Sequence, residues 1–186
     1  MKNFTKKNRN RMPKKITLEY LENSSLYYLS RFATSKNNLK QVMMRKILWS
    51  ARYHGTNSEE GKKLIEGLID RYLRSGLLND KVYAQNSAVK LHQQGNSSIK
   101  IRAKLKKKGV CNKDIEDALS SLEKIDENPE LAAAILYARR KCLGPFQISR
   151  LDDSTREKQL AKMARAGFSY KISNFIIFAK NKEELL

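Results

Sequence analysis

The sequence predicts an all-α protein, built as an elongated array of tandem three-helix units. Helix-breaking residues are scarce, since 8 glycines and 3 prolines stand among 186 residues, about half the usual share of roughly 12%. Apolar residues recur at helical spacing, and most periodic segments start after Ser, Thr or Asn and stop near glycine. One type of helix-to-helix joint also occurs twice, which favours a repeat; a single irregular helical domain is the alternative.

Caps and apolar spacing place the helices in order. The expected helices cover residues 18–33, 36–54, 59–75, 81–94, 99–108, 113–125, 129–142, 154–166 and 170–180. Thr17 and Ser35 are expected to cap the first two, and Asn112 is expected to cap the sixth. In the second helix, the core face of Leu39, Val42, Met43 and Ile47 can extend through Trp49 and Tyr53. In the fifth, Ile99, Ile101 and Leu105 are expected to form the buried stripe.

The repeated joint lies at Gly109-Val110 and again at Gly167-Phe168, 58 residues later. Each glycine can take the left-handed conformation of a Schellman cap, with the next apolar residue reaching back to the preceding helix. An earlier copy at Gly55 is elongated or diverged. We therefore expect a disordered basic arm over residues 1–16 and three helical units over residues 17–75, 76–126 and 127–186.

Positive charge is spread along the chain. Lys and Arg number 38 against 19 Asp and Glu, for a net charge of +19, and residues 1–15 hold seven basic residues and no acid. The window 81–113 also lacks acids and holds nine basic residues. This distribution favours a long contact with an anionic polymer, or with a protein that carries one, over a pocket for a small anion.

Two basic clusters are the candidate contact residues. The first has six cations in nine residues: Lys100, Arg102, Lys104, Lys106, Lys107 and Lys108. The second cluster, Arg139, Arg140 and Lys141, ends a predicted helix, where cations also stabilise the helix dipole. A solvated helix face is the alternative interpretation of the first cluster, and stabilisation of the helix end is that of the second. Trp49, Tyr53, Tyr83 and Tyr137 could stack on bases, although aromatic residues at helical spacing more often pack between helices.

Nothing in the sequence predicts an enzyme. His54 and His92 are far apart and are expected at the surface, and the glycines form no nucleotide-binding motif. Cys111 and Cys142 lack the partners for a zinc site or a disulfide framework, which fits a reducing cytoplasm. No apolar run approaches the roughly 18 residues of a membrane span. We expect no cofactor, no metal and no membrane insertion.

Three strings occur in order along the chain: Gly76-Leu77-Leu78-Asn79-Asp80-Lys-Val-Tyr83-Ala84, then Gly95-Asn-Ser-Ser-Ile99 continuing through Lys108-Gly109-Val110, then Arg165-Ala-Gly167-Phe168-Ser169-Tyr170. Their order and spacing resemble the RecX family of recombinase regulators, over roughly Leu18 to Ile177. The early Tyr28-Leu29-Ser30-Arg31-Phe32 also fits. The segment from Ile47 to Gly61 departs from the family, in which many relatives have a short Lys-Gly turn.

The resemblance implies tandem three-helix units and a binding protein without an active site. Family members lie in the helical groove of the RecA filament on single-stranded DNA and bridge neighbouring protomers. They reduce ATP hydrolysis, strand exchange and co-protease activity, and so regulate DNA repair, recombination and the SOS response. We accordingly expect a monomer that contacts RecA and single-stranded DNA, directly or through RecA. A basic helical module that binds DNA without RecA is the alternative.

Overall fold

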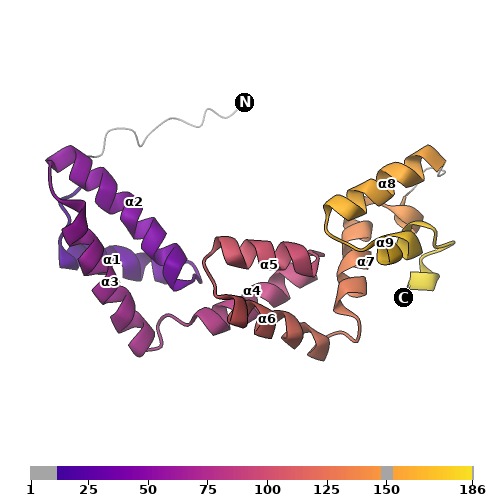
Figure 1. Cartoon of the computed structure of the whole chain (residues 1–186), viewed down its shortest axis with the longest axis horizontal. Helices are drawn as coiled ribbons and strands as arrows, with labels where there is room; N and C mark the ends of the chain where they lie inside the picture. The colour runs from indigo at the N-terminus through magenta and orange to yellow at the C-terminus, as the bar shows by residue number, and fades with distance from the viewer. Residues whose placement is uncertain (1–11, 148–152, 186) are drawn as a thin grey trace. The chain divides into compact units, whose positions relative to one another are not determined.

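The computed structural model describes residues 12–147 and 153–185, and every regular element in those ranges is helical, so the predicted all-α class is confirmed. Each predicted helix overlaps one helix in Figure 1. The α-helices are α1 (Leu18–Leu29), α2 (Lys36–His54), α3 (Ser58–Arg74), α4 (Asp80–Gln93), α5 (Ser98–Lys107), α6 (Asn112–Ser120), α7 (Pro129–Lys141), α8 (Asp153–Arg165) and α9 (Tyr170–Ile177). Short 3-10 helices are η1 (Ser121–Lys124), η2 (Gly144–Phe146) and η3 (Glu183–Leu185).

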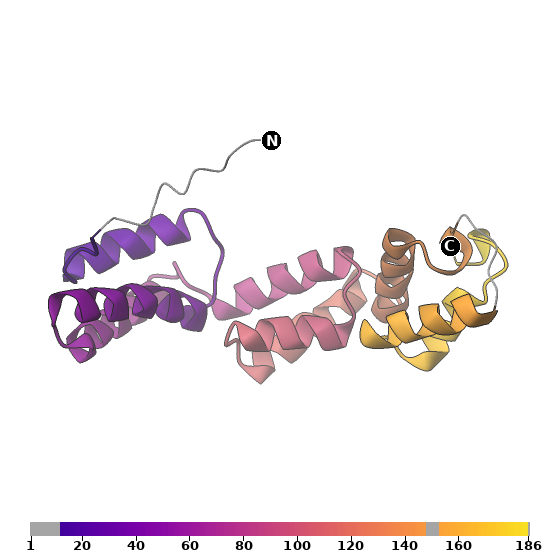
Figure 2. The same cartoon turned by 90° about the horizontal axis from the view of Figure 1, so that it is seen from above.

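The chain divides into two compact units, residues 1–79 and 80–186. The first unit contains α1 to α3, and the second contains α4 to α9, which Figure 2 shows from a second direction. The predicted division of the second part at residues 126 and 127 stays a prediction. Most of the predicted basic arm, residues 1–11, lies outside the described residues.

The first unit is built around one buried apolar cluster between its three helices. Leu21 of α1, Met43 of α2 and Ile65 of α3 are fully buried in it. At Gly61, an added Cβ would lie 2.7 Å from Cγ2 of Ile47, so only glycine lets α3 approach α2 this closely. The segment before α1 also contacts α2. Ser50 donates a hydrogen bond from Oγ to the Lys14 carbonyl oxygen at 2.8 Å.

The sequence prediction for the outer part of α2 was wrong. Trp49 and Tyr53 do not extend the core face, because their side chains are 54% and 52% exposed. The buried position there is Ser50, which follows Leu39, Met43 and Ile47 on the inner side of the helix. A small polar side chain at this point leaves room for the segment that carries Lys14.

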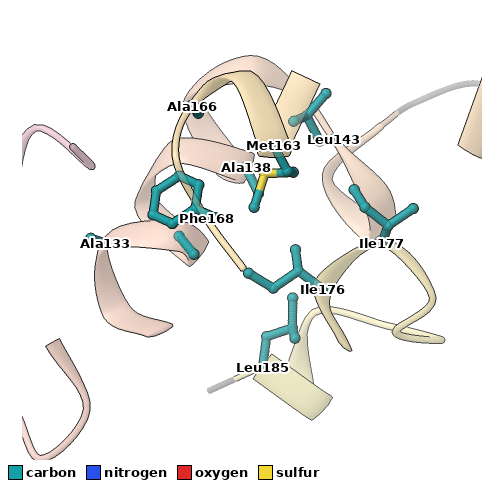
Figure 3. Packing of buried hydrophobic residues seen from close by; sticks show 10 residues of the cluster. Ala133, Ala138, Leu143, Met163, Ala166, Phe168, Ile176, Ile177 and Leu185 are labelled. Carbon is teal, nitrogen blue, oxygen red and sulfur yellow. The ribbon is translucent and has the colours of Figure 1, made fainter. Parts of the chain in front are cut away.

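The second unit contains two buried apolar clusters. The first lies between α4, α5 and α6, and its largest fully buried members include Ile101, Leu105 and Ile115. The second joins α7, α8 and α9. Figure 3 shows the Met163 side chain next to Ala138, with Ile176 pointing into the same cluster. Each group of three helices therefore has a core of its own within this unit.

Four helix ends in this unit share one hydrogen-bond pattern. At Gly109, φ is 73°, its N–H donates to Lys106, and the Val110 N–H donates to the Leu105 carbonyl. The corresponding bonds occur at Gly167, where φ is 89°, at Gly95 and at Cys142. These paired bonds are those of a Schellman cap. The first two helices of each group, α4 and α5 in one and α7 and α8 in the other, therefore end in the same type of cap.

Candidate nucleic-acid interface

Helix α5 carries most of the first basic cluster and is fixed mainly at its N-terminus. Ser97 caps it by accepting a hydrogen bond on Oγ from the Lys100 N–H, and the same hydroxyl donates to the Ala166 carbonyl at 2.6 Å. The Ser98 N–H donates to Oε2 of Glu130 at 3.0 Å. The bonds to Ala166 and Glu130 link the start of α5 to the α8–α9 joint and to α7.

The inner face of α5 is narrower than the sequence predicted. Ile101 and Leu105 are buried, as expected, but Ile99 is 59% exposed, so its assignment to the buried stripe was wrong. Ile99 instead lies beside the α8–α9 turn, where its Cβ would be 3.3 Å from a Cβ added to Gly167. Ile101 and Leu105 hold the helix against the core, and the cationic side chains of α5 lie on the rest of its surface.

The two predicted basic clusters meet at Tyr137, a half-buried residue of α7. Nζ of Lys100 lies 5.6 Å from the centre of the Tyr137 ring, and Cζ of Arg140 lies 5.7 Å from it. The ring is positioned by Phe168, at a centroid distance of 5.6 Å. The distances from Lys100 and from Arg140 to the Tyr137 ring are both within the range of a cation–π contact. Cations that are 40 residues apart in the chain therefore gather around one aromatic side chain.

The electrostatics of this region reflect crowded positive charge. Partial burial lowers the pKa of the Lys100 ammonium, and the neighbouring charges of Lys104, Arg140 and Lys141 lower the pKa further. All four cations belong to the second unit. We call Lys100 and Arg140, which lie over Tyr137, together with the neighbouring Lys104 and Lys141, the basic patch. A bound anion would offset the repulsion among these groups.

Lys104 of the basic patch and the remaining lysines of the first cluster lie toward the other end of α5. Lys104, whose Nζ donates to Oδ1 of Asn96 at 2.8 Å, lines a shallow groove between α4 and α5. Lys107 and Lys108 line the same groove, and Lys106 is exposed. Tyr83, Ser87 and Lys90, all on α4, also line this groove. We did not single out Lys90 from the sequence, although it lies in the acid-free window.

Two of the predicted contact residues, both arginines, contact side chains outside the basic patch. Arg102 donates from Nε and Nη2 to the carboxylate of Glu116, at 2.9 and 2.7 Å, and this contact lowers the pKa of Glu116. Arg139 lies over Phe146, with Cζ 5.6 Å from the ring centre, and not over Tyr137. The structure therefore separates these two cations from the basic patch.

His92 and Cys111 have structural roles in the described part of the chain. His92 is 4% exposed, so the expectation of a surface histidine was wrong; its Nε2 hydrogen-bonds the Pro129 carbonyl at 2.8 Å. Cys111 is free, and its Sγ accepts from the Asp114 N–H at the start of α6, where we had expected Asn112 to be the cap. Residues 12–147 and 153–185 contain no group of three His, Cys, Asp or Glu side chains placed to hold a metal.

Residues 12–147 and 153–185 include no helix that is long and apolar enough to span a membrane.

The fold and the basic patch define an all-helical protein with a positively charged surface. No family model matches the chain.

Comparison with known proteins identifies the family. The chain is 38% identical over 170 residues to "Regulatory protein RecX" of Myxococcus xanthus, which covers 89% of this chain and 88% of that protein. It is 26% identical to the protein of the same name from Agrobacterium fabrum, over 92% of this chain and 89% of that one. A crystal structure of RecX from Lactobacillus salivarius shares the fold, with a TM-score of 0.61 at 20% identity, over 86% and 94% of the two chains. The chain belongs to the RecX family of regulatory proteins.

Proposed function

We propose that this protein binds the RecA filament on single-stranded DNA and lowers its ATPase, strand-exchange and co-protease activities during DNA repair and recombination. In this proposal it acts as a monomer and has no catalytic activity of its own. Membership of a family of regulatory proteins supports the proposal. The observation that carries it is the convergence of the two basic clusters on Tyr137.

The basic patch suits a partner that combines phosphate with an acidic protein surface. A nucleoprotein filament offers both in one groove, so cations from α5 and from α7 can be neutralised together. Burial lowers the pKa of Lys100 most and its positive neighbours lower it further, and an anionic partner would offset the part of this cost that the neighbours add. Binding by such a surface should weaken as salt increases.

The direct test is a RecA ATPase titration on single-stranded DNA at several salt concentrations. We expect inhibition by the wild-type chain, strongest at low salt. The double variant Lys100→Gln/Arg140→Gln should raise the half-inhibitory concentration about tenfold or more, because a hydrogen bond to a charged group contributes about 1.5–3 kcal/mol. Arg102→Gln is the matched variant on the same helix, and it should have a smaller effect because Glu116 already engages its guanidinium.

Three outcomes separate this proposal from its alternatives. Absence of inhibition by excess wild-type protein at low salt would remove RecA from the proposal. DNA binding without RecA, combined with no inhibition of RecA, would favour a stand-alone DNA-binding module. The logarithm of its DNA affinity should then fall against the logarithm of salt concentration with a slope of about −0.7 per neutralised phosphate. Equal inhibition by the wild type and Lys100→Gln/Arg140→Gln, with unchanged circular dichroism, would show that the basic patch is only solvated and does not bind the partner.

A further inference from the structure

A second surface with mixed aromatic and basic character lies on α2, in the first unit. Arg45, Leu48, Trp49, Arg52 and Tyr53 are all exposed and follow each other at spacings of three, one, three and one residues. Such spacing places them along one side of a helix. We call these five residues the α2 stripe. The buried residues Leu39, Met43 and Ile47 hold the opposite side of α2 against the core of the unit.

The apolar part of the α2 stripe is unusual for a solvated helix face. Leu48, Trp49 and Tyr53 are 52%, 54% and 52% exposed, although each is a large side chain. Single exposed apolar residues are common, but adjacent ones on a single face mark an interaction surface. Trp49 is also the only tryptophan of the chain. The stripe is therefore a candidate binding surface with a fluorescent residue inside it.

The charge on α2 indicates the kind of partner. The helix contains five Lys and Arg residues and no Asp or Glu. Among the described residues, no carboxylate forms an ion pair with Arg45 or Arg52. At 1.5 Å per residue these two arginines lie about 10 Å apart along the helix axis, on either side of Trp49. A partner that fits must present negative charge beside flat apolar groups.

We propose that the α2 stripe binds single-stranded nucleic acid, with bases stacked on Trp49 and Tyr53 and phosphates at Arg45 and Arg52. Unpaired bases offer π-faces to aromatic side chains, whereas a duplex keeps its bases stacked inside the helix. A membrane surface fits less well, because an interfacial helix buries its apolar face about 5–10 Å deep, and the stripe alternates its apolar groups with arginines. This surface goes beyond the proposed function, because it belongs to the first unit and needs no RecA.

The experiment titrates the full-length protein with oligo(dT) and no RecA, following Trp49 fluorescence. We expect quenching on binding. In a parallel titration that follows the anisotropy of labelled oligo(dT), Trp49→Leu should weaken binding about fivefold to a hundredfold, the range expected for the loss of one stacked base. Trp49→Phe keeps an aromatic face and should restore much of the affinity.

A charge-matched pair tests the arginines. Arg45→Gln/Arg52→Gln should weaken quenching and reduce the slope of log affinity against log salt by about 1.4, or about 0.7 for each phosphate that is no longer neutralised. Lys63→Gln/Arg74→Gln removes the same charge from exposed positions of α3 in the same unit, and should leave the quenching curve nearly unchanged.

Several results would overturn the proposal. These are unquenched Trp49 fluorescence at saturating oligo(dT), equal affinities for Trp49→Leu and Trp49→Phe, or equal losses from the two charge-removing pairs. Quenching by vesicles of anionic lipid, but not by oligo(dT), would assign the stripe to a membrane surface instead. Because RecA is absent from these titrations, their failure would not bear on the ATPase test, and failure of the ATPase test would not bear on them.

Discussion

Gly167→Ala should destabilise the protein for two reasons that can be separated. The backbone at residue 167 has φ of 89°, a conformation that side-chain-bearing residues rarely adopt. An added Cβ would also lie 2.6 Å from Oγ of Ser97. That hydroxyl already donates to the Ala166 carbonyl and caps α5, so it can move away only by giving up these contacts.

The expected cost follows from these contacts. The left-handed conformation costs about 1 kcal/mol for alanine relative to glycine. Loss of the buried hydrogen bond from Ser97 to Ala166 adds about 1 kcal/mol, and loss of the α5 N-cap adds about 1 kcal/mol more. Gly167→Ala should therefore lower the free energy of unfolding by about 2–3 kcal/mol.

A double-mutant cycle with Ser97→Ala isolates the contact. Ser97→Ala alone should cost about 2 kcal/mol through the lost cap and hydrogen bond. In that background no hydroxyl remains to collide, so Gly167→Ala should cost only the roughly 1 kcal/mol of the backbone conformation. Urea denaturation followed by circular dichroism measures each free energy of unfolding. Additive effects within about 0.5 kcal/mol would refute the proposed contact between the two sites.

Two further predictions concern an exposed ion pair and a buried histidine. Arg102 lowers the pKa of Glu116, so the stabilisation from this pair is present above the ordinary carboxyl pKa and is lost as pH falls through the lowered value. The difference in Tm between wild type and Arg102→Gln should therefore vanish in acid. A difference that does not change with pH would contradict this. His92→Ala should cost about 2–4 kcal/mol in urea denaturation, because it leaves a cavity and an unsatisfied carbonyl of Pro129. His54→Ala, at a half-buried position with a similar bond to Pro13, should cost less, and equal losses would argue against burial as the cause.

Helix positions were predictable because their signals are local. Thr17 and Ser35 each accept a hydrogen bond from the N–H three residues later, as expected of cap residues. Boundaries were less certain where neighbouring residues compete for one role. Cys111 caps α6 in place of the expected Asn112, and the last turn of that predicted helix is the 3-10 helix η1. These differences move an end by a turn or less and leave the order of elements unchanged.

The facing of α2 could not be predicted from periodicity. Apolar residues occur on almost every side of this helix, so spacing alone allows Trp49 to face inward with Ile47. The choice depends on α3, where Gly61 admits Ile47 at close range. It also depends on the segment before α1, whose Lys14 carbonyl binds Ser50. Both determinants are tertiary contacts, and neither leaves a periodic trace in the sequence.

The candidate site shows the same limit. The sequence identified Lys100 and Arg140 as members of separate clusters, but only the packing of α5 beside α7 brings them to Tyr137. It also could not show that Arg102, in the middle of the same cluster, lies beside Glu116 of α6. Charge density along a chain indicates which segment is basic. The partner of each cation depends on how that segment is packed.

Helix α5 links the stability of the fold to its proposed binding role. It is a short helix that buries only Ile101 and Leu105, while most of its other side chains are cations. Their mutual repulsion opposes folding. Burial lowers the pKa of Lys100, and the neighbouring cations lower it further. The capping hydroxyl of Ser97, the Arg102–Glu116 pair and the favourable position of cations near the helix C-terminus offset part of that cost. An anionic partner at the basic patch would offset more, so the interaction that binds the partner would also stabilise the helix that presents the charge.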